Sequence, residues 1–244
     1  MLSQRIYEVQ SRIKKAALRV KRKPADVELI SVTKSVPIET IRELISLGVY
    51  HIGESNVQSA LTKYRELQQT TNNEPQTVVW HMIGHLQTNK VHDAVALFDW
   101  IHSVDSLRLA EKIHQSAQKL QKVMPILIEV NISGEKNKYG VQPEDLFELI
   151  SAVNLLKGIR IEGLMTMAPK VSDPEQTRPY FQHLTRLQAQ LREQYQSPYR
   201  FPHLSMGMSQ DFEIAIEEGA TMIRVGSAIF SLIPSSSSSS SSSS

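Results

Sequence analysis

Short apolar segments alternate with amphipathic segments along nearly the whole chain, and no other feature constrains the fold as strongly. Eight segments have the length and the Ile, Val and Leu content of buried strands: 27–33, 49–53, 77–83, 100–104, 125–132, 159–165, 202–206 and 221–225. Each of them except the last is clearly followed by a helical pattern. The strands are apolar on both faces, which is typical of parallel strands covered by helices on both sides.

Eight β/α units in about this length predict a single (β/α)8 barrel of the TIM type. A doubly wound open sheet is the alternative, but no G-x-G-x-x-G motif follows the first strand, which weakens a dinucleotide-binding interpretation. An extra helix is predicted at the N-terminus, outside the eight units. Its apolar residues Ile6, Val9, Ile13, Ala17 and Val20 recur near the helical period.

The domain boundaries follow from composition. No linker divides the chain, so residues 1–233 are predicted to form one barrel domain. Residues 235–244 are ten consecutive serines, which have no apolar side chains to bury. Residues 234–244 are therefore predicted to be a disordered tail outside the fold.

The composition excludes several kinds of site and partner. The 244 residues contain no cysteine, so disulfides and thiolate sites are ruled out. A net charge of +2 gives no global field that would attract nucleic acid or a membrane surface. The N-terminus has no apolar signal segment, and no run approaches the roughly 20 apolar residues of a membrane helix. We therefore predict a cytoplasmic protein with no nucleic-acid and no membrane partner.

Lys34 stands at the end of the first predicted strand. Active sites of TIM barrels lie at the carboxyl ends of the strands. Apolar neighbours that bury an ammonium group disfavour its charged form, so the Lys34 amine is expected to be nucleophilic near neutral pH. Such an amine is suited to forming a Schiff base with a carbonyl compound. The alternative is a lysine whose amine simply extends into solvent.

The last two strands end in small and hydroxylic residues, at the usual phosphate site of this fold. These residues are Ser205, Gly207, Ser209, Gly226 and Ser227. Glycines let backbone N–H groups approach an anion closely, and serine hydroxyls add donors. A phosphate here and an amine across the barrel mouth would suit a phosphorylated aldehyde, for which pyridoxal 5'-phosphate (PLP) is the obvious candidate.

His81 and His85 stand four residues apart, a spacing that suits a metal ion when both lie on one helix. The segment around His81 has the pattern of a strand, and Gly84 interrupts it. We therefore predict polar groups in the barrel mouth and no metal site.

Seven motifs occur in order along residues 1–230. They are SVTK at 31–34, IGE at 52–54, WHMIGHLQTNK at 80–90, VNIS at 130–133, EGLM at 162–165, LSMGMSQDF at 204–212 and IRVGSAIF at 223–230. The set closely resembles the pyridoxal phosphate homeostasis proteins, also called the YggS-like or PROSC-type family. The tryptophan–histidine and serine–methionine–glycine motifs are long and highly specific.

This resemblance implies a barrel like the N-terminal domain of alanine racemase, with PLP bound as a Schiff base to Lys34. It also implies an arginine at Arg224 facing the pyridine nitrogen, and phosphate contacts from Ser205, Gly226 and Ser227. The full set of cofactor-binding residues predicted is Lys34, Ser55, Asn56, His81, Met165, Ser205, Met206, Arg224, Gly226 and Ser227. Family members regulate vitamin B6 supply and influence amino-acid and keto-acid balance.

The chain departs from the family pattern at two places. The family usually has Gly-Glu-Asn after the second strand, whereas Glu54 is followed here by Ser55 and Asn56. Which of these two residues replaces the family's asparagine is open. The family also usually has a glycine after Ala-Ile-Phe, where this chain has Ser231, so the terminal segment is expected to differ.

Arg224 also bears on whether the chain is an enzyme. A guanidinium cannot accept a hydrogen bond, so it favours an unprotonated pyridine nitrogen and a weak electron sink. The leading hypothesis is therefore a monomeric PLP-holding homeostasis protein without catalytic residues, with PLP-dependent apoenzymes as acceptors. The alternative is an alanine-racemase-like enzyme with weak amino-acid racemase activity. Such enzymes take an opposing acid/base from a second domain and a partner subunit, and no second domain is expected in this chain.

Overall fold

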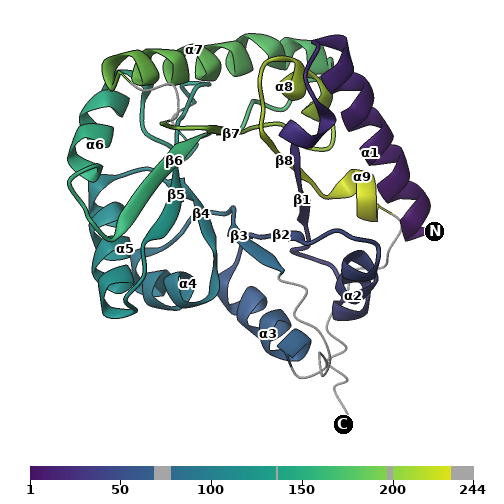
Figure 1. The fold of residues 1–244 in the computed structure, drawn as a ribbon, viewed down its shortest axis with the longest axis horizontal. Helices are drawn as coiled ribbons and strands as arrows, with labels where there is room; N and C mark the ends of the chain where they lie inside the picture. Colours follow the sequence, from purple (N-terminus) through teal and green to yellow (C-terminus); the bar gives the residue numbers. More distant parts are fainter. Residues whose placement is uncertain (69–77, 136, 197–199, 232–244) are drawn as a thin grey trace.

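The eight strands close into one parallel barrel (Figure 1) in the computed structural model, which describes residues 1–68, 78–135, 137–196 and 200–231. The strands are β1 Glu28–Val32, β2 His51–Glu54, β3 Val79–Met82, β4 Trp100–Val104, β5 Met124–Glu129, β6 Ile159–Met165, β7 His203–Ser205 and β8 Met222–Val225. Each strand pairs in parallel with the next, and β8 pairs with β1. The predicted TIM-type barrel is confirmed. The open-sheet alternative is wrong, because the pairing of β8 with β1 leaves no sheet edge.

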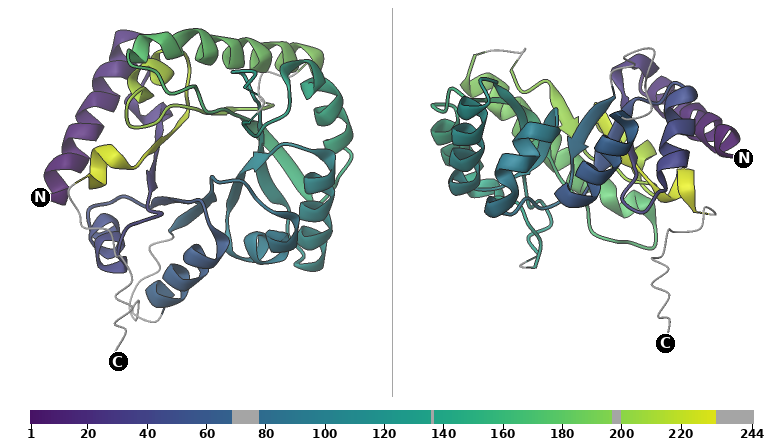
Figure 2. Two further views of the ribbon diagram at one scale, coloured as in Figure 1. Left: turned by 180° about the vertical axis from the view of Figure 1, so that it is seen from behind. Right: turned by 90° about the horizontal axis from the view of Figure 1, so that it is seen from below.

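Helices form a ring around the barrel, as both views along its axis show (Figures 1 and 2). They are α1 Leu2–Arg19, α2 Ile38–Ser46, α3 Val57–Gln68, α4 Val91–Leu97, α5 Leu107–Lys119, α6 Leu146–Val153, α7 Arg178–Gln194, α8 Phe212–Glu217 and α9 Ser227–Phe230. Short 3-10 turns at Pro143–Asp145 and Pro174–Thr177 precede α6 and α7. Both turns begin with proline, which lacks the N–H that a first helical turn leaves unpaired.

The predicted extra helix at the N-terminus is confirmed as α1. It packs against α8 and α9 on the outside of β8 and β1 (Figure 1). Two ion pairs join it to α8, Arg12–Glu213 at 3.0 Å and Arg19–Glu217 at 2.6 Å. Val20 was predicted to lie on the apolar face but is exposed, because α1 ends at Arg19 and the chain turns there. Since α9 has only four residues, α1 completes the helical cover beside it.

Side chains of the strands alternate between the barrel interior and the layer beneath the helices. Ile30, Leu127, Met165 and Met222 form an apolar cluster of their own, apart from the main core. The main core is the larger apolar layer that the helices share with the strands. A residue just after a strand therefore points into the carboxyl mouth of the barrel when this alternation places its side chain on the interior side.

Two of the eight predicted strands agree with the structure to the residue, and the other six differ by one to three residues at one or both ends. Residues 100–104 and 159–165 are strands as predicted. The fifth strand ends at Glu129, three residues early, because Val130 turns away and bridges Val141 instead. The predicted tail, 234–244, lies outside the described residues. Within the described part of the chain, no helix is both long and apolar enough to cross a membrane.

Candidate functional site

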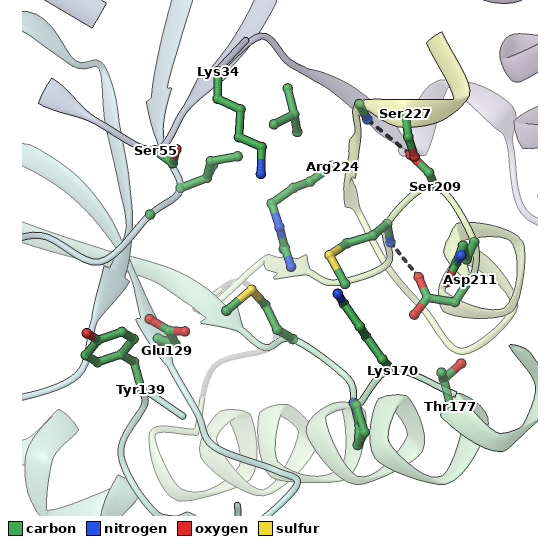
Figure 3. Close-up of a pocket in the computed structure, with 18 of the residues that line it drawn as sticks. Lys34, Ser55, Glu129, Tyr139, Lys170, Thr177, Ser209, Asp211, Arg224 and Ser227 are labelled. Carbon is green, nitrogen blue, oxygen red and sulfur yellow. Dashed lines mark hydrogen bonds between the residues drawn. The ribbon is translucent and has the colours of Figure 1, made fainter. Parts of the chain in front are cut away.

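A cavity of about 530 Å³ opens at the carboxyl ends of the strands, where the sites of TIM barrels lie (Figure 3). Its lining residues are Val32, Lys34, Ser55, Ile83, Gly84, His85, Glu129, Tyr139, Met167, Pro169, Lys170, Val171, Pro174, Thr177, Met208, Ser209, Gln210, Asp211, Arg224, Gly226 and Ser227. Apolar walls with a few charged groups are typical of sites for small organic ligands.

Lys34 lies two residues beyond β1, and its amine points into the cavity (Figure 3). The expectation that apolar neighbours bury this side chain is wrong. Lys34 is exposed, because β1 ends at Val32 and the loop that follows it lies at the open mouth of the barrel. The amine is therefore accessible to a ligand that enters from solvent.

The backbone beside Lys34 is held by a buried ion pair. Lys63 on α3 donates to the carbonyl oxygen of Thr33 at 2.6 Å and to the carboxylate of Glu54 at 2.7 Å. The Thr33 hydroxyl donates to the same carboxylate at 2.6 Å. Because Thr33 and Glu54 are fully buried, these bonds fix the direction in which the chain leaves β1.

Arg224 extends from β8 and lines the cavity although only 4% of it is exposed. Its guanidinium donates to the Ser205 hydroxyl at 2.6 Å and to the carbonyl oxygen of Thr166 at 2.8 Å. Burial lowers the pKa of Arg224 to about 10, while the charges of Glu129 and Asp211 act in the opposite direction. The group remains a cation at neutral pH, with further N–H donors available to the cavity.

Glu129 ends β5 and also lines the cavity, with only 3% of the residue exposed. Burial is the main cause that raises the pKa of its carboxyl group to about 7, and the nearby charge of Asp105 acts in the same direction. Arg224 opposes both effects by favouring the ionised form. Near neutral pH the carboxyl group is therefore divided between its protonated and ionised forms, as an acid/base group must be.

Replacing Glu129 by Gln is expected to stabilise the ligand-free protein above pH 7. The folded-state pKa of about 7 lies above the ordinary value of 4.5, so the favourable contribution of the protonated group is complete below pH 4.5 and is lost as the pH rises to 7. At about 1.4 kcal/mol per pKa unit, the ionised carboxylate costs up to about 3 kcal/mol at pH 8. Urea unfolding between pH 4 and 8 checks this; equal stabilities of the two proteins at pH 8 would contradict the raised pKa.

The segments that follow β7 and β8 meet at one side of the cavity. The Oγ atom of Ser209 accepts hydrogen bonds from the backbone N–H groups of Gly226 and Ala228, each at 3.2 Å, which leaves its own hydroxyl hydrogen to donate elsewhere (Figure 3). Ser227 is exposed, and as the first residue of α9 it has no intrahelical partner for its N–H. This side of the cavity is therefore rich in uncharged donors.

Gly207 follows β7 but does not line the cavity. Its φ of +91° favours glycine, and an added Cβ would lie 2.5 Å from Cβ of Ala215 and 2.9 Å from Cα of Phe212. The glycine thus allows the turn into α8 to pack closely. Because Gly207 does not line the cavity, its position does not support the predicted role of binding an anion.

Gly207→Ala is expected to destabilise the fold by about 2–4 kcal/mol, because it adds overpacking to backbone strain. Gly48→Ala is the matched control. Gly48 has a φ of +80°, and nothing lies within 4 Å of an added Cβ there, so this variant isolates the strain. Denaturant unfolding of both variants measures the difference. Equal losses would show that the contact with α8 contributes nothing.

Comparisons with known proteins agree with this geometry. The family model described as "Alanine racemase, N-terminal domain" matches residues 9–234. The pyridoxal phosphate homeostasis protein of Aquifex aeolicus (strain VF5) is 43% identical over 227 residues, 93% of this chain and 96% of that protein.

This chain belongs to the pyridoxal phosphate homeostasis protein family. The solved structure of PipY from Synechococcus elongatus PCC7942, with PLP bound, is similar to this family member with a TM-score of 0.78 at 35% identity. The match covers 94% of this chain and 100% of PipY. Alanine racemase of Clostridium difficile 630 has a TM-score of 0.66 at 16% identity, which shows a shared fold, and this chain covers 55% of it.

The structure brings together half of the residues predicted to bind a cofactor in this family. Lys34, Ser55, Arg224, Gly226 and Ser227 line one cavity. Of the two residues after Glu54, Ser55 faces the cavity. Asn56 does not, because its side-chain oxygen accepts a hydrogen bond at 3.0 Å from the N–H of Ser59 at the start of α3.

Four other predicted residues are buried away from the cavity, so direct ligand contact is not expected for them. His81 hydrogen-bonds inside the barrel, and Met165 packs in the separate apolar cluster with Ile30. Ser205 binds the Arg224 guanidinium and acts through it. Met206 directly follows Ser205, so its side chain points to the other face of the sheet, where it packs in the main core.

Sequence reasoning missed several residues of the cavity wall. Glu129 was overlooked because the fifth strand was extended past its real end. Tyr139 and Lys170 come from long loops, and Thr177 ends the 3-10 turn before α7; no periodicity reveals the positions of such residues. Asp211 lines the cavity too; its carboxylate accepts from the N–H of Met208 at 2.6 Å, and burial raises its pKa. Among the described residues, no cluster of His, Asp and Glu could hold a metal ion.

Proposed function

We propose that this chain binds PLP through Lys34 and serves as a PLP-holding homeostasis protein. The observation that carries the proposal is that the amine of Lys34 and the guanidinium of Arg224 enter one cavity, whose third side is the donor-rich segment after β7 and β8 (Figure 3). An amine, a cation and a set of uncharged donors match an aldehyde, a pyridine nitrogen and a phosphate, respectively.

The residues present fit PLP at each of its functional groups. Lys34 offers a primary amine for the aldehyde, and Ser209 and Ser227 offer donors for the phosphate. Arg224 offers N–H groups to an acceptor nitrogen, and Val32 and Ile83 supply apolar contact for a ring. When bound, PLP supplies an aldehyde for Schiff-base chemistry and a ring that withdraws electrons.

Arg224 determines how strongly the pyridine ring of bound PLP would withdraw electrons. With a pKa of about 10 the guanidinium remains protonated at neutral pH, and it only donates hydrogen bonds. It therefore favours a pyridine nitrogen that carries no proton. An unprotonated ring withdraws electrons weakly, which favours holding the cofactor over converting amino acids with it.

We infer that release goes to PLP-dependent apoenzymes and that the protein acts as a monomer in the cytoplasm.

Weak racemase activity is the second candidate, and Glu129 is the observation that favours it. Its carboxyl group, with a pKa of about 7, lines the same cavity as Lys34 and would supply a second acid/base. Amino-acid α-proton exchange in deuterated water tests this function. Turnover that disappears in both Lys34→Ala and Glu129→Gln would establish the racemase, whereas exchange no faster than without protein would exclude it.

Borohydride reduction followed by peptide mapping tests the PLP proposal directly. Protein saturated with PLP is reduced and digested, and the phosphopyridoxyl group is located by mass spectrometry. We expect modification of Lys34 alone. Lys170 is the informative competitor, because it is an exposed amine lining the same cavity. Predominant modification of Lys170, or of a lysine outside the cavity, would refute the assignment.

A further inference from the structure

A continuous row of hydrogen-bonded side chains crosses the interior of the barrel and ends on Arg224. We call this row the histidine ladder; it consists of Glu28, His51, His81, His102, Ser205 and Arg224. Successive members are 3.3, 3.0, 2.9, 3.0 and 2.6 Å apart between their polar atoms. Barrel interiors are usually filled with branched apolar side chains, so a row of three hydrogen-bonded imidazoles needs an explanation.

The two ends of the ladder lie in different surroundings. Arg224 lines the cavity at the carboxyl mouth. Glu28 and His51 line a second cavity of about 430 Å³ at the amino ends of β1 and β2, where their side chains are 46% and 27% exposed. His81 and His102 between them are fully buried. The ladder thus connects solvent at one end of the barrel with the candidate site at the other.

The chemistry of the end groups determines the direction of the hydrogen bonds. Arg224 can only donate, and the Glu28 carboxylate can only accept. Burial holds the pKa values of His81 and His102 well below the usual range, so each is neutral, with one donor and one acceptor nitrogen. With His51 also neutral, every member must donate toward Glu28. His81 and His102 then both carry their hydrogen on Nε2, and Ser205 donates to Nδ1 of His102.

One additional proton reverses this order. When both nitrogens of His51 carry hydrogen, Nε2 still donates to Glu28 and Nδ1 donates to His81. His81 and His102 must then carry their hydrogens on Nδ1, and His102 donates to Ser205. Each hydrogen between Ser205 and His51 moves to the other atom of its own bond, so His51 gains the hydrogen of His81, and the additional proton restores the hydroxyl hydrogen that Ser205 passes to His102. The Ser205 oxygen then accepts from both His102 and Arg224.

We propose that the histidine ladder positions the Arg224 guanidinium and transmits the protonation of His51 to it. The inference rests on the proposed function only where it concerns PLP. In the first order, the Ser205 oxygen has Arg224 as its donor, and its own hydrogen is committed to His102. In the reversed order two donors share this oxygen, so the guanidinium is held less firmly. These histidines are positioning residues and do not touch the ligand.

Other side chains near the ladder also influence the charge on its histidines. His203 on β7 lies near both His81 and His102 and disfavours a positive charge on either. Burial lowers the pKa of His203 itself, while Glu162 on β6 acts in the opposite direction. Trp100 stacks on His81 with a centroid distance of 6.1 Å and adds no charge. Among these neighbours, only Glu28 forms an ion pair with His51.

Nuclear magnetic resonance of ¹⁵N-histidine-labelled, PLP-free protein tests the ladder without any variant. At pH 8 we expect His81 and His102 both to carry hydrogen on Nε2. At lower pH, when the ¹⁵N shifts show hydrogen on both nitrogens of His51, His81 and His102 should both be in the Nδ1 form. Mixed tautomers at pH 8, or tautomers that do not follow His51, would overturn the proposal. Because no PLP is present, this result is independent of the Lys34 assignment.

A variant at His51, near the end of the ladder that is far from Arg224, tests the effect of the ladder on PLP binding. His51→Leu removes the acceptor for His81, and we expect PLP to bind about five-fold more weakly, the equivalent of one hydrogen bond. His51→Asn keeps an acceptor near the Nδ1 position and should bind within two-fold of the unaltered protein, as should the control His92→Asn on the exposed side of α4. Unchanged affinity in His51→Leu would refute the coupling. Failure of Lys34 trapping alone would refute the PLP proposal and leave the ladder standing.

Discussion

Lys34→Ala protein is expected to lose the borohydride-stable PLP adduct and to bind PLP at least about a hundred-fold more weakly, a loss of roughly 3 kcal/mol. The amine of Lys34 is the nucleophile that the cavity presents from β1, and alanine leaves only non-covalent contacts with the walls. The measurement is titration of the visible absorbance band of the Schiff base, together with equilibrium dialysis for the non-covalent affinity.

Lys170→Ala is the matched control, since it removes an exposed amine from the opposite wall of the same cavity (Figure 3). It should retain the visible band, with affinity lowered only by the loss of one screened charge, about 1 kcal/mol or less. Thermal unfolding of both variants should match that of the unaltered protein, because each lysine is exposed. An intact visible band in Lys34→Ala would contradict the proposed function.

Arg224→Met is expected to destabilise the protein by about 3–5 kcal/mol at pH 8, the usual result of removing one partner from a buried set of charges. Glu129 and Asp211 would lose the cation that favours their ionised forms. The Ser205 hydroxyl and the Thr166 carbonyl oxygen would lose their shared donor. Urea unfolding at pH 8 and pH 6 measures the loss, which should be smaller at pH 6, where Glu129 is mostly protonated.

The double variant Arg224→Met/Glu129→Gln separates the charge effect from the packing effect. Because Gln carries no charge and Arg224 offsets part of the cost of the ionised carboxylate, we expect Glu129→Gln to recover at least about 3 kcal/mol in the Arg224→Met background at pH 8, more than it gains in the unaltered protein. Arg160→Met is the control at an exposed strand position, where the ion pair with Glu162 should contribute less than about 1 kcal/mol. Equal effects of Glu129→Gln with and without Arg224 would show that the two groups do not interact.

Comparison of the predicted and observed strands shows what periodicity can resolve. Apolar runs with clear boundaries, such as 100–104, were predicted to the residue. The fifth strand was extended too far because Val130 and Ile132 are as apolar as the strand itself, and only its tertiary partner Val141 draws the chain away. Lys34 was placed correctly at the barrel mouth, but its exposure depends on where β1 ends, which a pattern of apolar residues cannot decide.

By itself the sequence determined the barrel, the extra helix α1 and the residues at the strand ends, because alternation and short motifs are local properties of the chain. Only the closed tertiary structure decided which of these residues share a cavity and which are buried beneath it. The charge interaction of Arg224 with Glu129 and the hydrogen bonds that link His51, His81, His102 and Ser205 join residues up to 103 positions apart, the separation of His102 and Ser205. Such contacts depend on strand register and barrel closure, and these are set by the packing of all eight strands together.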